Sequence, residues 1–227
     1  MNWHLLPVIS APMSFQMAFD ECLFENIKKY PAAPLLRFYV SSEPWITAGF
    51  SFRNAESLRR SELVKSHPGI PAAKRITGGG CVLHGRDIVF SLVARMDSIP
   101  DLGPVKASYA RIHEAVQGGF RAFGLDPRYY EDTEARGRGA DCFFHPVPND
   151  LEWKGRKVAG GAQKRSGGVL LHHESIVVPA GVSKPDMIKS LRDSFEKVFE
   201  IGITEVNLDP EIYFQAMKRL RMEARCL

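Results

Sequence analysis

The chain has few cysteines, and their spacing argues against two classes of small protein. Four of its 227 residues are cysteine, at positions 22, 81, 142 and 226. No two of them form a Cys-x-x-Cys pair, and the cysteines and histidines do not stand at the spacing of a zinc ligand set. We therefore expect free thiols, with neither a disulfide framework nor a metal site.

Long hydrophobic runs are also missing. No stretch of the sequence approaches the apolar length that a membrane-spanning helix needs. The first residues, "MNWHLLPVISAPMSFQ", have no basic leader ahead of their apolar run and reach Pro7 and Pro12 early, which is not the pattern of a secretory signal. We expect a cytoplasmic protein that does not bind a membrane.

Several signatures of nucleotide-binding and hydrolytic enzymes are absent. The glycine-rich segments match neither Gly-x-Gly-x-x-Gly nor the P-loop pattern, and neither Ser91 nor Ser175 stands in a Gly-x-Ser-x-Gly elbow. The chain has no internal repeat and no low-complexity tract. These absences give little support to a serine hydrolase or a P-loop enzyme.

Positive charge is in modest excess. The formal net charge is +4, which is small for a dedicated nucleic-acid binder, so we expect no nucleic-acid partner. The basic residues do gather in one short segment that could steer an acidic protein or a phosphate. That segment contains Lys154, Arg156, Lys157, Lys164 and Arg165.

Hydrophobic periodicity predicts an α+β or mixed α/β fold in a single domain over residues 1–227. The 3.6-residue period and capping residues favour helices over 13–30, 54–65, 104–123, 184–200 and 209–224. Strand patterns occupy 35–40, 44–49 and 87–94, the last of which is apolar enough to be buried on both faces. Two hairpins follow, with turns at Lys154-Gly155 and Gly167-Gly168. Residues 126–148 have no sustained period and are predicted to form a surface loop.

Three consecutive glycines interrupt "KRITGGGCVLHG" just before the predicted central strand. Gly78, Gly79 and Gly80 give up side-chain packing and cost backbone entropy, so a positive φ or a close approach must require them. Two alternatives stay open at this stage, a tight turn and a cradle for a ligand.

Lys157 is the first candidate for chemistry. It follows the Lys154-Gly155 turn and precedes the small residues of "VAGGAQ". A lysine that rises beside a glycine-rich segment can polarise a carbonyl or hold a phosphate. The alternative is one more solvated charge on a hairpin.

Cys142 is the cysteine best placed to act as a nucleophile, because it lies in the long loop. Arg136 and Arg138 would favour its thiolate, whereas Asp141 would oppose it. The other cysteines suit a core or incidental role. Histidines that could supply a base are His84, His145, His172 and His173, and their separations do not define a metal site.

Several ordered motifs together resemble the biotin/lipoate protein ligase A/B family. They are "KRITGGGCVLH", "IVFSLV" and "NDLEWKGRKVAGGAQKRSGGVLLHHESI", and the earlier "MSFQMAFDECLF" and "PLLRFYVSSEPWITAGFS" also look like the family's opening helix and strands. The resemblance covers most of residues 13–178. It implies the catalytic-domain fold of that family, a mixed, largely antiparallel sheet flanked by helices.

Within the family, "DCFFHP" ahead of "NDLEWKGRKVAG" looks most like the octanoyltransferases of the LipM type. That resemblance implies that Cys142 takes an octanoyl or lipoyl group from an acyl carrier protein as a thioester. A lysine of a lipoyl domain or of a glycine cleavage H protein would then accept the group, without ATP, another cofactor or a metal. Lys157 would contact the acyl carbonyl. The implied substrate-binding residues are Arg75, Thr77, Gly78, Gly79, Gly80, His84, Gly160, Gly161, Ala162 and His172.

Two segments depart from the pattern that the resemblance implies. Where relatives often read Gly-Ser-Ala-Gln, this chain has Gly160-Gly161-Ala162-Gln163, and where they often have His-Gly it has His172-His173-Glu174. Two rival functions remain. An ATP-dependent lipoate or biotin ligase would use Lys157 on an acyl-adenylate with Cys142 as a bystander, and a non-catalytic acyl-carrier-binding module would form no covalent intermediate.

Overall fold

A computed structural model describes residues 1–27, 33–131, 150–207 and 209–223 of the chain. Among these residues, eight strands form one sheet in the order β11-β1-β2-β6-β10-β9-β8-β7. β1 runs parallel to both of its neighbours, and the other pairings are antiparallel. The strands are β11 (Gly202–Glu205), β1 (Asn2–Ala11), β2 (Leu35–Ser41), β6 (Ile88–Arg95), β10 (Val169–Ile176), β9 (Arg156–Ser166), β8 (Leu151–Trp153) and β7 (Arg128–Tyr129). This is the mixed, largely antiparallel sheet that the sequence predicted.

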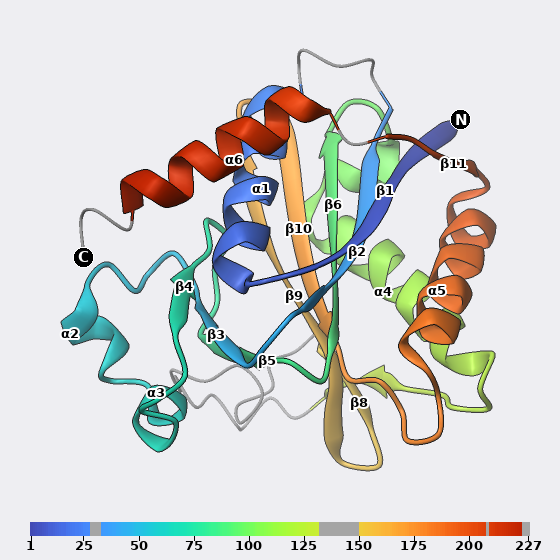
Figure 1. Cartoon of the computed structure of the whole chain (residues 1–227). Helices are drawn as coiled ribbons and strands as arrows, with labels where there is room; N and C mark the ends of the chain where they lie inside the picture. The colour runs from blue at the N-terminus through green and yellow to red at the C-terminus, as the bar shows by residue number, and fades with distance from the viewer. Residues whose placement is uncertain (28–32, 132–149, 208, 224–227) are drawn as a thin grey trace.

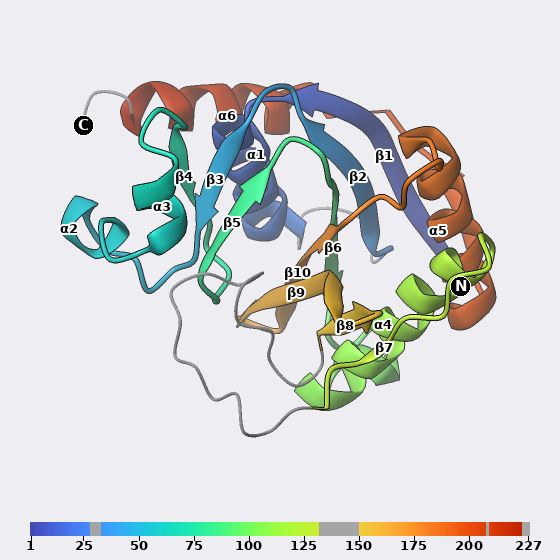
Figure 2. The same cartoon turned by 90° about the horizontal axis from the view of Figure 1, so that it is seen from below.

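Helices cover both faces of this sheet (Figures 1 and 2). α4 (Val105–Arg121) and α5 (Lys184–Phe199) pack on one face, called here the α4 face. α1 (Met13–Asn26) and α6 (Pro210–Glu223) pack on the other, called the α1 face. Since each face has its own helix layer, β6 is buried along all but its last residue, as predicted for 87–94.

Each helix layer encloses its own hydrophobic core. On the α4 face, the rings of Trp3, Phe38, Phe90 and Phe195 are fully buried together. On the α1 face, Phe19 packs with aliphatic side chains of β6, β10 and α6. The two cores fix the central strands between them and leave the strand ends to carry polar groups.

A second, smaller sheet lies beside α1 (Figure 1). It has the order β4-β3-β5 and is joined to two short helices. The elements are β3 (Trp45–Ala48), α2 (Ala55–Leu58), α3 (Glu62–Ser66), β4 (Ala72–Lys74) and β5 (Cys81–His84), and a short 3-10 turn, η2 (Pro100–Leu102), precedes α4. The glycine run connects β4 to β5 and is therefore held by this sheet.

Both predicted hairpin turns are present. Lys154 and Gly155 have φ of 51° and 74°, and Gly167 and Gly168 have φ of 57° and 78°. Two successive positive φ angles are the signature of the tight turn whose twist matches antiparallel strands.

Some predicted boundaries are wrong for identifiable reasons. The single helix expected over 54–65 is two helices, because Ser61 accepts a hydrogen bond from the Val64 amide and starts a second one. Asn54 caps the first helix, as predicted. α4 ends at Arg121, and Gly124 follows with a φ of +72°. Val105, which the period placed on the apolar face, is 54% exposed.

Five strands were not predicted, namely β1, β4, β5, β7 and β11, and β7 (Arg128–Tyr129) falls in the segment 126–148 that was expected to be a loop. β1 contains Pro7, and a register shift between Leu6 and Ile9 accommodates the irregularity. β11 is short and pairs with β1 across nearly the whole sequence. Residues 132–149, which include Cys142 and most of the predicted loop, lie outside the described residues. None of the described helices is both long and apolar enough to cross a bilayer.

Candidate active site

The glycine loop between β4 and β5 is braced from within by Arg75. Its Nη2 donates to the carbonyl oxygens of Gly78 and Gly80, both at 2.8 Å, and its Nη1 donates to the Thr47 carbonyl at 3.1 Å. The whole residue is 5% exposed. The Arg75 side chain thus fixes the shape of the loop by binding the loop's backbone carbonyls.

The structure explains the need for glycine at two positions of this region. Gly79 has a φ of +88°, a conformation that other residues adopt with strain. Its carbonyl also lies where a Cβ at Gly49 would stand, so the loop packs directly on the Gly49 backbone. A Cβ at Gly78, by contrast, would meet no atom of the described residues within 4 Å. A tight turn therefore accounts for Gly79. The close approach of two backbone segments is the one between Gly79 and Gly49, and it requires glycine at position 49.

His84 lies at the end of β5 in a buried chain of polar groups. Its Nδ1 is 2.7 Å from Asp87 Oδ2, and its Nε2 is 2.8 Å from the Thr47 hydroxyl. Since the carboxylate accepts, Nδ1 carries a proton. Burial by itself would raise the pKa of Asp87, but His84, the Ser175 hydroxyl and the Gly85 amide outweigh it and lower the pKa. These hydrogen bonds fix the orientation of the His84 ring, and Thr47 links His84 to Arg75.

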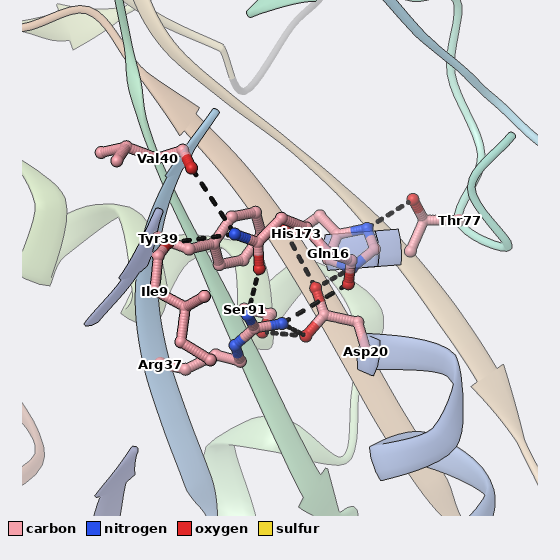
Figure 3. A network of polar contacts seen from close by, with 9 residues as sticks. All are labelled: Ile9, Gln16, Asp20, Arg37, Tyr39, Val40, Thr77, Ser91 and His173. Carbon is pink, nitrogen blue, oxygen red and sulfur yellow. Dashed lines mark hydrogen bonds and ion pairs between the residues drawn. The ribbon is translucent and has the colours of Figure 1, made fainter. Parts of the chain in front are cut away.

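A second polar chain leads to the glycine loop from inside the α1 face (Figure 3). The Asp20 carboxylate accepts from Arg37 at 2.7 Å, Ser91 at 2.7 Å, Tyr39 at 2.9 Å and His173 at 3.0 Å. Burial would raise the pKa of Asp20, yet Arg37 and His173 lower it far below its usual range. Asp20 is therefore a buried anion with a full set of donors.

His173 carries this chain to the loop. Its Nε2 donates to Asp20, and its Nδ1 lies 3.1 Å from the Thr77 hydroxyl. The sequence had named His173 only as a possible base and had not singled out Asp20 or Arg37. The available signal was Asp20 itself, an acidic residue within a mostly apolar helix segment. A carboxylate that is buried in such a place is expected to have a charged partner.

The neighbouring His172, predicted to bind substrate, lies on the α4 face instead. Successive side chains of a strand point to opposite faces, so His172 and Glu174 share a face that His173 does not. His172 Nε2 is 2.8 Å from Glu174 Oε2, and His113 Nε2 of α4 is 3.2 Å from the same oxygen. The structure therefore brings His173, and not His172, to the glycine loop.

The three groups of this α4-face cluster titrate differently. Burial would raise the pKa of Glu174, but the two histidines lower it to about 2. Burial would lower the pKa of His113, and Glu174 raises it above its ordinary value. Burial lowers the pKa of His172. The cluster is thus a buried His113–Glu174 ion pair beside a neutral His172.

Lys157 is buried with Asp150, which excludes the solvated alternative. Its Nζ is 2.7 Å from Asp150 Oδ2, and the two side chains are 6% and 5% exposed. A Cβ at Gly160 would collide with Cε and Nζ of Lys157. The absence of a side chain at position 160 is what allows the lysine to lie there.

Strand register places this pair on the same face as the two polar chains. Gly160 stands opposite Ser175, and Ala162 stands opposite His173. Ser175 binds Asp87, the partner of His84. Gly160 and Ala162 therefore lie on the α1 face, Gly160 against Lys157 and Ala162 opposite the His173 that binds Thr77. The structure places the predicted Lys157, Gly160 and Ala162 on the face of the sheet from which Thr77 and His84 are held.

Gly161 belongs to the α4 face, because a Cβ there would collide with Glu174 and His172.

The basic residues of the predicted segment 154–165 do not form one exposed patch. Lys157 is buried, and Arg165 turns inward to donate to the carbonyls of Leu102 and Gly103. Lys154 lies over the Trp153 ring and Lys164 over the Phe50 ring. Over the described part of the chain, no group of three or more His, Cys, Asp or Glu residues could hold a metal ion.

Comparison with known proteins identifies the family. Residues 12–205 match the sequence model of the lipoyl protein ligase A/B catalytic domain. The chain belongs to this family. It is 36% identical over 182 residues to the octanoyltransferase LipM of Moorella thermoacetica, an alignment that covers 78% of this chain and 65% of that protein. The chain thus spans just under two thirds of the length of this curated relative.

Solved structures of the lipoyl protein ligase A/B family share the fold. A lipoate-protein ligase A bound with ATP superposes with a TM-score of 0.77 at 23% identity, covering 97% of this chain and 95% of that one. A bi-partite lipoate protein ligase from Thermoplasma acidophilum gives 0.73 at 22% identity, with 97% and 92% covered. These comparisons confirm the family and fold that the sequence motifs implied.

Proposed function

We propose that the protein is an octanoyltransferase that moves an octanoyl or lipoyl group from a thioester donor to a protein lysine. Its 36% identity to the octanoyltransferase LipM of Moorella thermoacetica supports this function most directly. The burial of Lys157 against Asp150 at 2.7 Å supports it independently, because a held ammonium is suited to stabilising an oxyanion.

The first half-reaction acylates the enzyme. The Cys142 thiolate attacks the carbonyl carbon of the donor thioester, a new carbon–sulfur bond forms, and the donor thiolate leaves. Lys157 donates a hydrogen bond to the carbonyl oxygen as negative charge develops on it. Asp150 holds the ammonium in place, so the donor geometry exists before the substrate arrives.

The second half-reaction transfers the group. The neutral amine of an acceptor lysine attacks the Cys142 thioester, an amide forms, and the thiolate of Cys142 is regenerated as the amine loses its proton. An amide is more stable than a thioester, so the transfer runs downhill and consumes no ATP. No metal or further cofactor takes part in this scheme.

The acyl chain lies against the glycine loop in this proposal. Thr77 and His84 are held from behind by His173 and Asp87, and the small residues Gly160 and Ala162 stand opposite Ser175 and His173 on the neighbouring strand. Each buried CH₂ contributes ~0.8 kcal/mol, so a medium-length chain gains several kcal/mol without polar recognition. Gly78, Gly79 and Gly80, braced by Arg75, form one wall.

The proposed partners follow from the reaction. An acyl carrier protein supplies the group, and a lipoyl domain or a glycine cleavage H protein accepts it. The Thermoplasma acidophilum structure was determined for a lipoate protein ligase and its E2 lipoyl domain, which supports an acceptor of this kind. We place the reaction in the cytoplasm and assign it to residues 1–227 as one catalytic domain.

Mass spectrometry of the protein after incubation with octanoylated acyl carrier protein, called here octanoyl-carrier, tests the proposal. We expect one added octanoyl group, removable by neutral hydroxylamine and mapped by peptide digestion to Cys142. Cys142→Ser should abolish the adduct, whereas Cys22→Ser, which alters a cysteine buried on α1, should keep it. A folded wild-type protein that takes up no acyl group from an active donor would rule the function out.

A further inference from the structure

An exposed phenylalanine beside the glycine loop lies between two lysines from distant parts of the chain. Phe50 is 51% exposed. The Lys74 ammonium lies 5.4 Å from its ring centroid, and the Lys164 ammonium lies 5.2 Å from it. Lys74 ends β4 and Lys164 belongs to β9, so the fold brings them together on one ring. Phe50, Lys74 and Lys164 are called here the Phe50 patch.

The patch is positively charged, and no described carboxylate neutralises it. Neither Lys74 nor Lys164 has an ion pair with another residue in the described ranges. Arg53, also exposed, adds a third cation near Phe50 in the sequence. Two ammonium groups held at one ring repel each other, and an anionic partner would relieve that repulsion.

The Phe50 patch is attached directly to the candidate active site. The Phe50 amide donates to the Thr77 carbonyl at 2.9 Å, and the Gly49 backbone packs on Gly79. Lys74 immediately precedes Arg75, the brace of the loop. Anything bound at the patch therefore lies next to the loop that the proposed function assigns to the acyl chain.

From these contacts we infer that the Phe50 patch docks the acyl donor, a small acidic carrier domain that presents its thioester on a phosphodiester-linked arm. An exposed aromatic ring with cations on its rim is the composition of a protein–protein contact, with the ring as the apolar centre and the charges guiding encounter. The inference rests on the proposed function, because it names the surface that the donor of that reaction uses.

Charge reversal with a choice of donors tests this inference. We expect the double variant Lys74→Glu/Lys164→Glu to acylate Cys142 from octanoyl-carrier about tenfold or more slowly at low salt, with a weaker salt dependence than the wild type. Acylation from octanoyl-N-acetylcysteamine, which is uncharged and has no carrier domain, should keep its wild-type rate. Lys197→Glu changes the net charge in the same direction on the exposed surface of α5 and should leave both rates unchanged.

Other outcomes would overturn the inference. Equal losses with both donors would mean that the substitutions damage the site. An equal loss with octanoyl-coenzyme A would mean that the phosphorylated arm alone is recognised. A loss confined to transfer from acyl-enzyme to the lipoyl domain would mean that the patch docks the acceptor.

A binding measurement separates this inference from the proposed function. Fluorescence anisotropy with labelled carrier that bears no acyl group requires no chemistry. We expect the dissociation constant of the double variant to be at least ten times larger than that of Lys197→Glu. If the wild type binds carrier through the patch but forms no acyl-enzyme, the proposed function fails and the docking surface stands.

Discussion

Glu174 stands directly opposite Gly161 on the neighbouring strand, and its carboxylate fills the space that a side chain at position 161 would take. Both residues belong to the two segments where the sequence departs from the pattern of the family it resembles, Gly160-Gly161-Ala162-Gln163 and His172-His173-Glu174. The structure places these two departures opposite each other, and the Glu174 carboxylate binds His113 and His172.

We therefore predict that a side chain at position 161 destabilises the protein through Glu174. Gly161→Ala should lower the free energy of unfolding by about 1–3 kcal/mol, the usual cost of overpacking. The same substitution should cost less in a Glu174→Gly background, and urea unfolding of the four proteins measures that coupling. Gly69→Ala is the control, because a Cβ at Gly69 meets nothing within 4 Å in the described structure. Equal costs of Gly161→Ala in both backgrounds would show that Glu174 is not the cause.

The buried ion pair predicts a pH dependence of stability. Glu174→Gln should destabilise the protein by about 3 kcal/mol near pH 5.5, because it leaves His113 buried without its counter-charge. The pKa of Glu174 is lowered from 4.5 to about 2, so its contribution is complete above pH 4.5 and disappears as the pH falls toward 2. The pKa of His113 is raised from 6.5, so its contribution is complete below pH 6.5 and disappears as the pH rises through the raised value.

The difference in unfolding free energy between wild type and Glu174→Gln should therefore be largest between pH 4.5 and 6.5. Urea titrations at several pH values measure it. A difference that is constant from pH 3 to pH 9 would contradict the assignment of an ionised pair.

The Asp20 network should be far more sensitive to the loss of its charge than to the loss of one neutral donor. Asp20→Asn removes the counter-charge of buried Arg37 and should cost about 3 kcal/mol or more. Tyr39→Phe deletes a single hydroxyl that donates at 2.9 Å and should cost about 1 kcal/mol. Thermal and urea unfolding of the two variants give the comparison. Similar costs would mean that Asp20 is not ionised in the folded protein.

Lys157 should matter for catalysis as well as for stability, because its replacement leaves the buried Asp150 carboxylate without its counter-charge. Lys157→Met should slow acylation of Cys142 about a hundredfold, the scale seen when one oxyanion donor is removed. Lys154→Met, three residues earlier on the exposed turn, should leave the rate unchanged. Pre-steady-state acylation by quenched flow measures both, with circular dichroism to check folding. An unchanged rate in Lys157→Met would remove the lysine from the mechanism.

Local signals in the sequence were sufficient for much of the fold. The hairpin turns at Lys154-Gly155 and Gly167-Gly168, the cap at Asn54 and the buried strand β6 depend on neighbouring residues and were predicted correctly. The pairing of β1 with β11 joins residues about two hundred positions apart, and no local pattern contains it. The cap at Ser61, which divides the 54–65 segment, is equally local, because its partner is the amide of Val64.

For the candidate site, the sequence identified residue types more reliably than faces. The sequence indicates Lys157 and the glycine loop as candidates, but it does not distinguish His172 from His173, because strand register decides which of two adjacent histidines faces the loop. Asp20 and Arg37 come from α1 and β2, and only their meeting in space reveals an ion pair. The role of Cys142 lies outside the described residues and stays a prediction.

Single-turnover transfer from isolated acyl-enzyme tests the central claim most directly. Protein acylated on Cys142 is freed of donor and mixed with lipoyl domain in the absence of ATP. The account predicts that the octanoyl group moves to one lysine of the domain at a rate no slower than steady-state turnover, with the free thiol of Cys142 restored. The account is contradicted if the domain is octanoylated only when octanoate and ATP are supplied, with release of pyrophosphate and with Cys142→Ser fully active.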